Sequence, residues 1–99
     1  GLRWQIFTFN NGYNDKNSIS QASFTSLAAR LHRFTGNATF YGEWATRVVE
    51  WTRSIGLINQ NGQTFDGTDA TSNCSQINRL QWTNNAGLFL ATGAFSANA

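Results

Sequence analysis

The side chains best suited to acid–base or nucleophilic chemistry are the carboxylates, and this sequence of 99 residues has only five of them. They are Asp15, Glu43, Glu50, Asp66 and Asp69. A pair of carboxylates can supply a general acid, a general base or a nucleophile. No two aspartates are adjacent, and Asp66 precedes a glycine in a dipeptide typical of turns. The sequence therefore favours a structural role for Asp66 and Asp69 over a catalytic pair.

Metal and thiol chemistry have even fewer candidate residues. Cys74 is the single cysteine and His32 the single histidine, so the chain has no ligand spacing typical of a zinc site and cannot form an internal disulfide. We expect neither a metal nor a cofactor.

The low charge content of the sequence and the distribution of its basic residues limit the classes of partner that it could bind. Only 12% of the residues are charged, and the seven basic residues are scattered rather than clustered. A nucleic-acid partner is not expected, because phosphate binding needs a basic patch or stripe. No apolar run approaches the roughly 20 residues that a membrane-spanning helix needs.

Two glycosylation sequons occur, one at Asn37 and one at Asn73. They would be modified only in an exported protein, and chance matches are common in an asparagine-rich chain. Together with the single cysteine, they favour a secreted or cell-surface location.

Apolar residues predict a first helix over residues 18–35. They recur at intervals of three and four, the period of an amphipathic helix. These residues are Phe24, Leu27, Ala28, Leu31 and Phe34. Asn17 or Ser18 is the expected N-cap, and Gly36 is placed to end the helix.

The same spacing predicts a second helix over residues 38–55, capped by Asn37 or Thr39. Its apolar positions are Tyr41, Trp44, Val48, Trp51 and Ile55. The short connection makes the two helices antiparallel. The residues expected to be buried between them are Leu27, Leu31, Trp44, Val48 and Trp51.

The remaining segments have weaker patterns. Residues 57–74 lack either period and predict a long loop or short extended pieces. A third helix is expected over about residues 75–94. Residues 3–9 alternate enough to predict a short strand that ends at the Asn11-Gly12 turn. The expected fold class is all-α, with a short strand or hairpin at the N-terminus.

Three stretches together resemble the fungal members of glycoside hydrolase family 76, the mannan endo-1,6-alpha-mannosidases. They are "GLRWQIFTFNNGYNDKNSIS", "LAARLHRFTGNATFYGEWA" and "FDGTDATSNCSQINRLQWTNNAG". The resemblance implies a secreted or wall-bound glycosidase with an (α/α)6 barrel. It also implies that residues 1–99 are the middle portion of that catalytic domain, so the chain alone should be inactive.

The resemblance implies substrate-binding residues but no catalytic ones within the chain. The family's consecutive aspartate pair is expected upstream of Gly1. Sugars are held by aromatic faces and by amide or charged side chains. The implied substrate-binding residues are Trp4, Gln5, Lys16, Asn17, Gln81 and Asn85. Helix capping is an equally good role for Asn17, and Trp82 could belong to the core of the barrel.

Three activities are compatible with the resemblance. The first is endo-acting hydrolysis of alpha-1,6-mannan, and the second is transglycosylation that attaches glycolipid-linked mannoproteins to the cell wall. The third is mannan binding without catalysis, since Asp15 and Asn84 replace tyrosines that the family usually has. Membrane association is expected only through a glycolipid anchor outside this chain.

Overall fold

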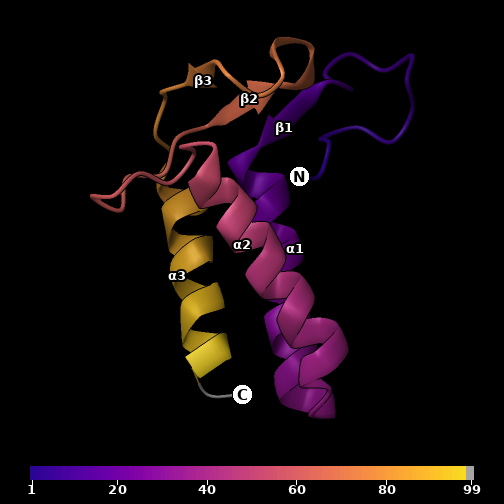
Figure 1. The fold of residues 1–99 in the computed structure, drawn as a ribbon, viewed down its shortest axis with the longest axis vertical. Helices are drawn as coiled ribbons and strands as arrows, with labels where there is room; N and C mark the ends of the chain where they lie inside the picture. The colour runs from indigo at the N-terminus through magenta and orange to yellow at the C-terminus, as the bar shows by residue number, and fades with distance from the viewer. Residues whose placement is uncertain (98–99) are drawn as a thin grey trace.

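The computed structural model describes residues 1–97 and is mostly helical, with a small antiparallel sheet at one end (Figure 1). The helical elements are α1 (Ser18–Thr35), the π-helical turn η1 (Ala38–Gly42), α2 (Glu43–Ser54), the 3-10 turn η2 (Ala70–Ser72) and α3 (Thr83–Ala97). The strands are β1 (Asp15–Asn17), β2 (Gly67–Asp69) and β3 (Ile77–Asn78), in the order β1-β2-β3. No helix within residues 1–97 is long and apolar enough to cross a membrane.

Helix α1 has the predicted bounds, and both caps form as expected. The Asn17 Oδ1 accepts a hydrogen bond of 3.0 Å from the backbone N–H of Ser20. At the other end Gly36 has a φ of 71°, and its N–H donates to the carbonyl of His32 over 2.8 Å. Glycine adopts a left-handed backbone conformation with the smallest steric penalty, so Gly36 determines where this helix ends.

The second helical segment also lies where it was predicted, but it begins with the π-helical turn η1. Asn37 caps this turn, because its Oδ1 accepts from the N–H of Phe40 over 3.1 Å. A Cβ on Gly42 would lie 3.0 Å from the Nδ1 of His32. Glycine therefore allows this turn to approach α1 closely. The connection between α1 and η1 lies at the end of the molecule opposite the sheet (Figure 1).

The predicted antiparallel pair forms, but most of its predicted core is wrong. Of the five expected residues only Val48 is buried; Leu31 and Trp51 are half-buried, and Leu27 and Trp44 are 59% and 44% exposed. The residues buried on α1 and α2 are mostly small. They are Ser18, Gln21, Ala22, Thr25, Ser26, Ala28 and Ala29 on α1, and Ala45, Val48 and Thr52 on α2.

Helix α3 packs against α1 through this small-residue face. The hydroxyls of Thr25 and Thr92 lie 3.3 Å apart in the buried contact, and the Thr25 hydroxyl also donates to the carbonyl of Ala22. Small side chains let backbones approach closely, so the helices meet along this face. Larger side chains of the apolar stripe, such as Leu27 and Trp44, lie outside this buried contact and remain exposed.

Two further predictions need correction. Residues 3–9 form turns and bends rather than a strand, and the N-terminal strand is Asp15–Asn17. The N–H of Asn10 donates to the carbonyl of Phe7 over 3.1 Å within a turn, and the rings of Phe7 and Phe9 stack with centroids 5.4 Å apart. The third helix begins at Thr83 rather than near residue 75, because the chain before it pairs with β2 as strand β3.

The segment over residues 57–74 forms short extended pieces and turns, as predicted. The N–H of Phe65 donates to the carbonyl of Leu57 over 2.8 Å, and both side chains are buried. Strand β2 then pairs with β1 in the register Asp15↔Asp69 and Asn17↔Gly67. This pairing attaches the loop to the first turn of α1.

Candidate functional site

The sheet brings segments that are far apart in sequence to the first turn of α1. Strand β2 lies between the other two, so Gly67 pairs with Asn17 on one side and with Asn78 on the other. The N–H of Trp4 donates to the carbonyl of Asp15 over 2.8 Å, which attaches the N-terminal loop to β1. The predicted sugar-binding residues near positions 4, 16 and 81 therefore belong to the same end of the molecule.

Trp4 lies over a glycine in the N-terminal loop and remains half exposed. Gly12 has a φ of 83°, and a Cβ there would come within 2.4 Å of the indole ring. Any larger residue would displace the ring. Trp4 is 51% exposed, so it presents apolar surface to solvent. Its neighbour Gln5 is half-buried, and its Oε1 accepts a long hydrogen bond of 3.5 Å from Asn10.

Asn17 is a helix cap in this structure. Its Oδ1 accepts from Ser20, its Nδ2 donates to Asp15 over 3.3 Å, and the side chain is only 6% exposed. Capping was one of its two predicted roles, and this geometry confirms capping. Contact between Asn17 and substrate stays a prediction.

Lys16 is half-buried beside an aromatic ring. Its Nζ lies 5.5 Å from the centroid of the Trp51 ring, within the range of a cation–π contact. The sequence assigned Trp51 to packing between α1 and α2 and missed this pairing. Trp51 also lies against Gly1, where an added Cβ would come within 2.3 Å of the ring. The aromatic stripe of α2 thus reaches the sheet end.

Gln81 and Asn85 were predicted in the middle of a third helix, and the structure places them differently. Gln81 is exposed in the segment before α3, whereas Asn85 lies in the first turn of α3 and is only 2% exposed. Trp82 is 53% exposed and is not a core residue within residues 1–97. Gln81 is therefore accessible to a ligand, whereas Asn85 is not.

A polar cavity of about 430 Å³ lies at the sheet, but none of the six predicted residues lines it. Its lining residues are Asp15, Asp66, Gly67, Thr68, Asp69, Gln76, Ile77 and Asn78. The sequence did not point to this cavity because strand pairing alone brings its three aspartates together. Within residues 1–97, no group of three or more His, Cys, Asp and Glu side chains could hold a metal ion.

The carboxylates of this cavity have different proton affinities. Burial raises the pKa of Asp15, and the negative charges of Asp66 and Asp69 raise it further, whereas the hydrogen bond from Asn17 lowers it. Hydrogen bonds from the hydroxyl and N–H of Thr71 lower the pKa of Asp69. Asp15 thus holds a proton more readily than Asp69.

Asp66 makes structural contacts at the start of β2. Its carboxylate accepts from the Nδ2 of Asn78 over 3.3 Å, and its carbonyl accepts from the N–H of Ser18 over 2.7 Å. The sequence placed Asp66-Gly67 in a turn, but Gly67 begins the central strand. A Cβ on Gly67 would lie 3.0 Å from the Cα of Asn17, so glycine permits the close strand pairing.

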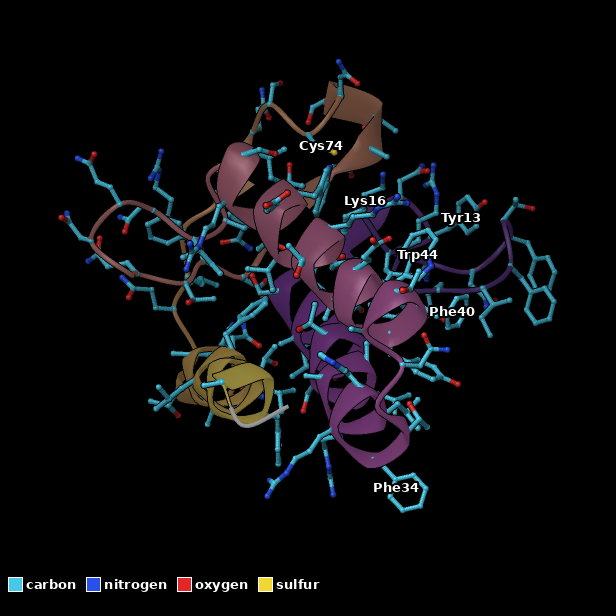
Figure 2. The ribbon with its side chains drawn as sticks, turned by 60° about the horizontal axis from the view of Figure 1, so that its bottom comes forward. Tyr13, Lys16, Phe34, Phe40, Trp44 and Cys74 are labelled. Atoms are coloured by element: carbon cyan, nitrogen blue, oxygen red, sulfur yellow. The ribbon has the colours of Figure 1, made fainter. Side chains whose placement is uncertain are left out.

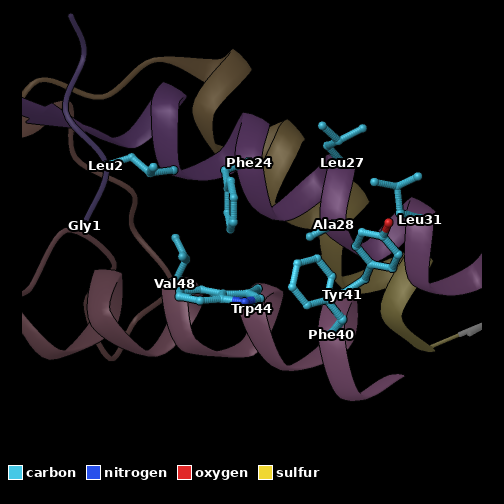
Figure 3. A pocket seen from close by; sticks show the side chains of 10 residues that line it. All are labelled: Gly1, Leu2, Phe24, Leu27, Ala28, Leu31, Phe40, Tyr41, Trp44 and Val48. Carbon is cyan, nitrogen blue, oxygen red and sulfur yellow. The ribbon is translucent and has the colours of Figure 1, made fainter. Parts of the chain in front are cut away.

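A second hollow, of about 550 Å³, lies between α1 and α2 and is apolar (Figure 3). It is lined by Gly1, Leu2, Phe24, Leu27, Ala28, Leu31, Phe40, Tyr41, Trp44 and Val48. Most of the predicted core stripe lies here. Its apolar character distinguishes this groove from the polar cavity at the sheet.

The sheet end and the helices are both included in the similarity to known proteins, which extends over the whole chain. The profile described as Glycosyl hydrolase family 76 matches residues 1–99. The chain belongs to this family.

Relatives in family 76 are similar along the full chain. Mannan endo-1,6-alpha-mannosidase DCW1 of Eremothecium gossypii is 52% identical over 102 residues, which cover 99% of this chain and 22% of that protein. Mannan endo-1,6-alpha-mannosidase DFG5 of Saccharomyces cerevisiae is 46% identical over 101 residues, covering 100% of this chain and 22% of that protein. The chain thus spans about a fifth of the length of these curated relatives.

A solved structure shares the fold. The crystal structure of Dfg5 from Chaetomium thermophilum in complex with glucosamine superposes with a TM-score of 0.93 at 45% identity. The match covers 97% of this chain and 23% of that one. The fold of this chain is therefore also present in that structure.

Proposed function

We propose that the protein containing this chain is an endo-acting mannosidase that hydrolyses alpha-1,6-mannan in cell-wall biogenesis or mannan breakdown. The observation that carries the proposal is the similarity to relatives that are named mannan endo-1,6-alpha-mannosidases and are 52% and 46% identical over the whole chain. In this proposal the three helices are part of an (α/α)6 barrel.

The role proposed for this chain is substrate binding rather than bond cleavage. Retaining glycosidases need two carboxyl groups about 5 to 5.5 Å apart. In this proposal the family's aspartate pair lies outside these residues, as the resemblance implied. Trp4 offers a half-exposed ring and Gln81 an exposed amide at the sheet end, and Lys16 supplies a cation beside Trp51.

Gln81 gives the sharpest test of the site, because its exposure separates binding from folding. If its amide holds a sugar hydroxyl, Gln81→Ala in the active full-length protein should lower kcat/KM by an amount equal to about 1 to 3 kcal/mol. Its melting temperature should stay unchanged. Gln60→Ala is the matched control, since Gln60 is an exposed glutamine in a turn outside the three strands.

The opposite result would refute the binding role of Gln81. A lower melting temperature with unchanged turnover per folded molecule would show that this side chain supports the structure instead.

One observation favours transglycosylation as a second candidate activity. The solved relative binds glucosamine, which is not a component of a mannan chain. An enzyme that attaches glycolipid-linked mannoproteins to the cell wall would need to accept a sugar other than mannose in its site. Incubating the full-length protein with alpha-1,6-mannan, with and without a glucosamine-containing acceptor, separates the two activities. Release of reducing ends without any transfer product would exclude transglycosylation.

The third candidate, a mannan-binding relative without catalysis, predicts a different result in the same assay. It would retain mannan on a column while producing neither reducing ends nor transfer products. Finding the consecutive aspartate pair in the full-length protein would count against it.

We propose a secreted or cell-wall location, with membrane attachment only through a glycolipid anchor outside this chain. The two sequons support export, since both Asn37 and Asn73 are exposed. Fractionation of cells that express the full-length protein from its own gene would test this location. Recovery only in the cytosolic fraction would overturn it.

A further inference from the structure

Phe34 is an unusually exposed aromatic residue in the last turn of α1. At 89% it has the largest exposed fraction among the large hydrophobic residues of residues 1–97. Figure 2 shows its ring pointing away from the helices, far from Lys16 and the sheet. Within the described residues the ring thus presents apolar surface that a neighbouring group could cover.

A glycosylation sequon begins three residues after Phe34. Asn37, Ala38 and Thr39 are all exposed. Gly36 lies between the ring and the sequon, and its φ of 71° turns the chain out of α1. Phe34 and Asn37 therefore emerge at the same end of the helical hairpin.

The side chain of Asn37 can accept a glycan without losing its structural role. Its Oδ1 caps η1 by accepting from the N–H of Phe40. Its Nδ2, the atom that carries an N-linked sugar, has no hydrogen-bond partner among the described residues. Substitution at Nδ2 leaves the carbonyl oxygen free to accept, so the cap and the modification are compatible.

We propose that Asn37 carries an N-linked glycan whose first N-acetylglucosamine packs its C–H face against the ring of Phe34. This inference rests on the exported location proposed above. The co-reactant is an oligosaccharide on a lipid pyrophosphate. A bond forms between Nδ2 and the anomeric carbon, the bond from that carbon to the pyrophosphate oxygen breaks, and the proton lost from the amide is released. The aromatic ring then covers apolar sugar surface that would otherwise face water.

The second sequon provides an internal comparison. Asn73 is also exposed, but the residue three positions before it is Ala70, so no ring occupies the corresponding place. Asn73 has a φ of 56°, and the hydroxyl of Ser75 donates to the carbonyl of Ser72. A glycan at Asn73 would lie at the sheet end, away from Phe34.

The experiment uses the full-length protein, secreted from yeast behind a heterologous leader. The four forms are the unmodified sequence, Phe34→Ala, Thr39→Ala and the double variant. Thr39→Ala removes the sequon but keeps the Asn37 cap, and no described residue is hydrogen-bonded to the Thr39 side chain. Mass spectrometry before and after an N-glycan-releasing enzyme measures occupancy at Asn37, and thermal melting measures stability.

We expect Asn37 to be occupied, and Phe34→Ala to lower the melting temperature by a few degrees only when the glycan is present. In the Thr39→Ala background the same change should have no effect. A further pair of forms, Ser75→Ala with and without Phe34→Ala, removes the other sequon and should show the same effect of Phe34→Ala.

Two results would overturn the proposal. One is an unmodified Asn37 in the protein that the leader has sent through the secretory route. The other is an equal effect of Phe34→Ala with and without the sequon, which would show that the ring packs against protein. A parallel preparation with the protein's own N-terminus separates these results from an error in the proposed location, because only that preparation depends on natural export.

Discussion

The two ends of the α1–α2 hairpin differ in how firmly they are held. At the sheet end, Asn17, Ser18 and Gln21 are buried polar residues: Asn17 caps α1, whereas Ser18 and Gln21 are hydrogen-bonded to neighbouring segments. At the turn end, every residue from 33 to 40 is exposed. The same helix is thus fixed by polar contacts where it begins and is free at the surface where it ends.

The sheet end is held by contacts that span the sequence. The Gln21 side chain accepts from the N–H of Leu2 over 2.9 Å and donates to the carbonyl of Leu2 over 2.7 Å. The Ser18 hydroxyl donates to the carbonyl of Phe65. These bonds tie the N-terminal loop and the segment before β2 to one turn of α1. The candidate site therefore lies at the end where side chains are held by hydrogen bonds, and the Asn37 sequon lies at the end where the residues are exposed.

The largest expected effect is the loss of cooperative folding when residues 1–97 are not supported by further chain. The buried hydrophobic residues described here are four alanines, Val48, Leu57 and Phe65, which is little apolar area to offset chain entropy. We expect the isolated 99-residue chain to melt without a cooperative transition and to show no activity on mannan. A sharp calorimetric transition would show that the polar sheet end suffices, and measurable turnover would refute the expected inactivity.

Removing Gln21 should give the largest effect of a single substitution. Gln21→Ala in the full-length protein leaves the N–H and carbonyl of Leu2 without their partner, which should cost about 1 to 3 kcal/mol of unfolding free energy. Chemical denaturation measures the change.

Gln81→Ala is the matched control for Gln21→Ala. Because Gln81 is exposed, its substitution should lower the free energy of unfolding by less than about 0.5 kcal/mol. Equal losses for the two glutamines would contradict the claim that buried polar contacts hold the sheet end.

Local signals predicted much of the fold. The helical period, the Asn17 cap and the glycine at position 36 were enough to place α1 at its observed bounds. These features depend on residues that are close in sequence. The sequence failed where distant segments decide the outcome, as in residues 77–78, which form a strand because β2 lies beside them.

The buried face and the candidate site show the same limit. The spacing of apolar residues placed Leu27 and Leu31 on one face of α1. It could not predict that the alanines and threonines on another face pack against α3. Likewise, the cavity that contains Asp15 exists only because β1 and β2 pair. Trp4 and Gln81 are exposed, and their role in substrate binding stays a prediction, whereas the burial of Asn85 could not be inferred from its residue type.

The two asparagine caps compare the ends directly, since Asn17 and Asn37 each accept a hydrogen bond from an N–H three residues later. We expect Asn17→Ala to cost about 1 to 2 kcal/mol and Asn37→Ala about 0.5 kcal/mol, because only the first cap is buried and also donates to Asp15. Both should be measured by denaturation in the Thr39→Ala background, which keeps any glycan out of the comparison. A larger loss at Asn37 would reverse the assigned order of rigidity.

The smallest expected effect concerns the charges at the sheet end. The pKa of Asp15 is raised on folding, chiefly by burial, so the native state binds this proton more tightly than the unfolded state. The ionised carboxylate therefore destabilises the fold at neutral pH, and stability is gained as pH falls through the folded pKa towards the unfolded value. Asp15→Asn should raise stability at pH 7 by less than about 0.5 kcal/mol, since solvent screens the site.

Asp69→Asn tests the sign of this argument, because hydrogen bonds from Thr71 lower the pKa of Asp69. Its ionised form contributes stability that is present above the unfolded pKa and is lost as pH falls through the folded pKa. Asp69→Asn should therefore lower the melting temperature at pH 7, whereas Asp15→Asn raises it. Both differences from the unmodified protein should shrink in acid, once both carboxyls are protonated. Shifts in the same direction at pH 7 would contradict the opposite pKa directions assigned to these two carboxyls.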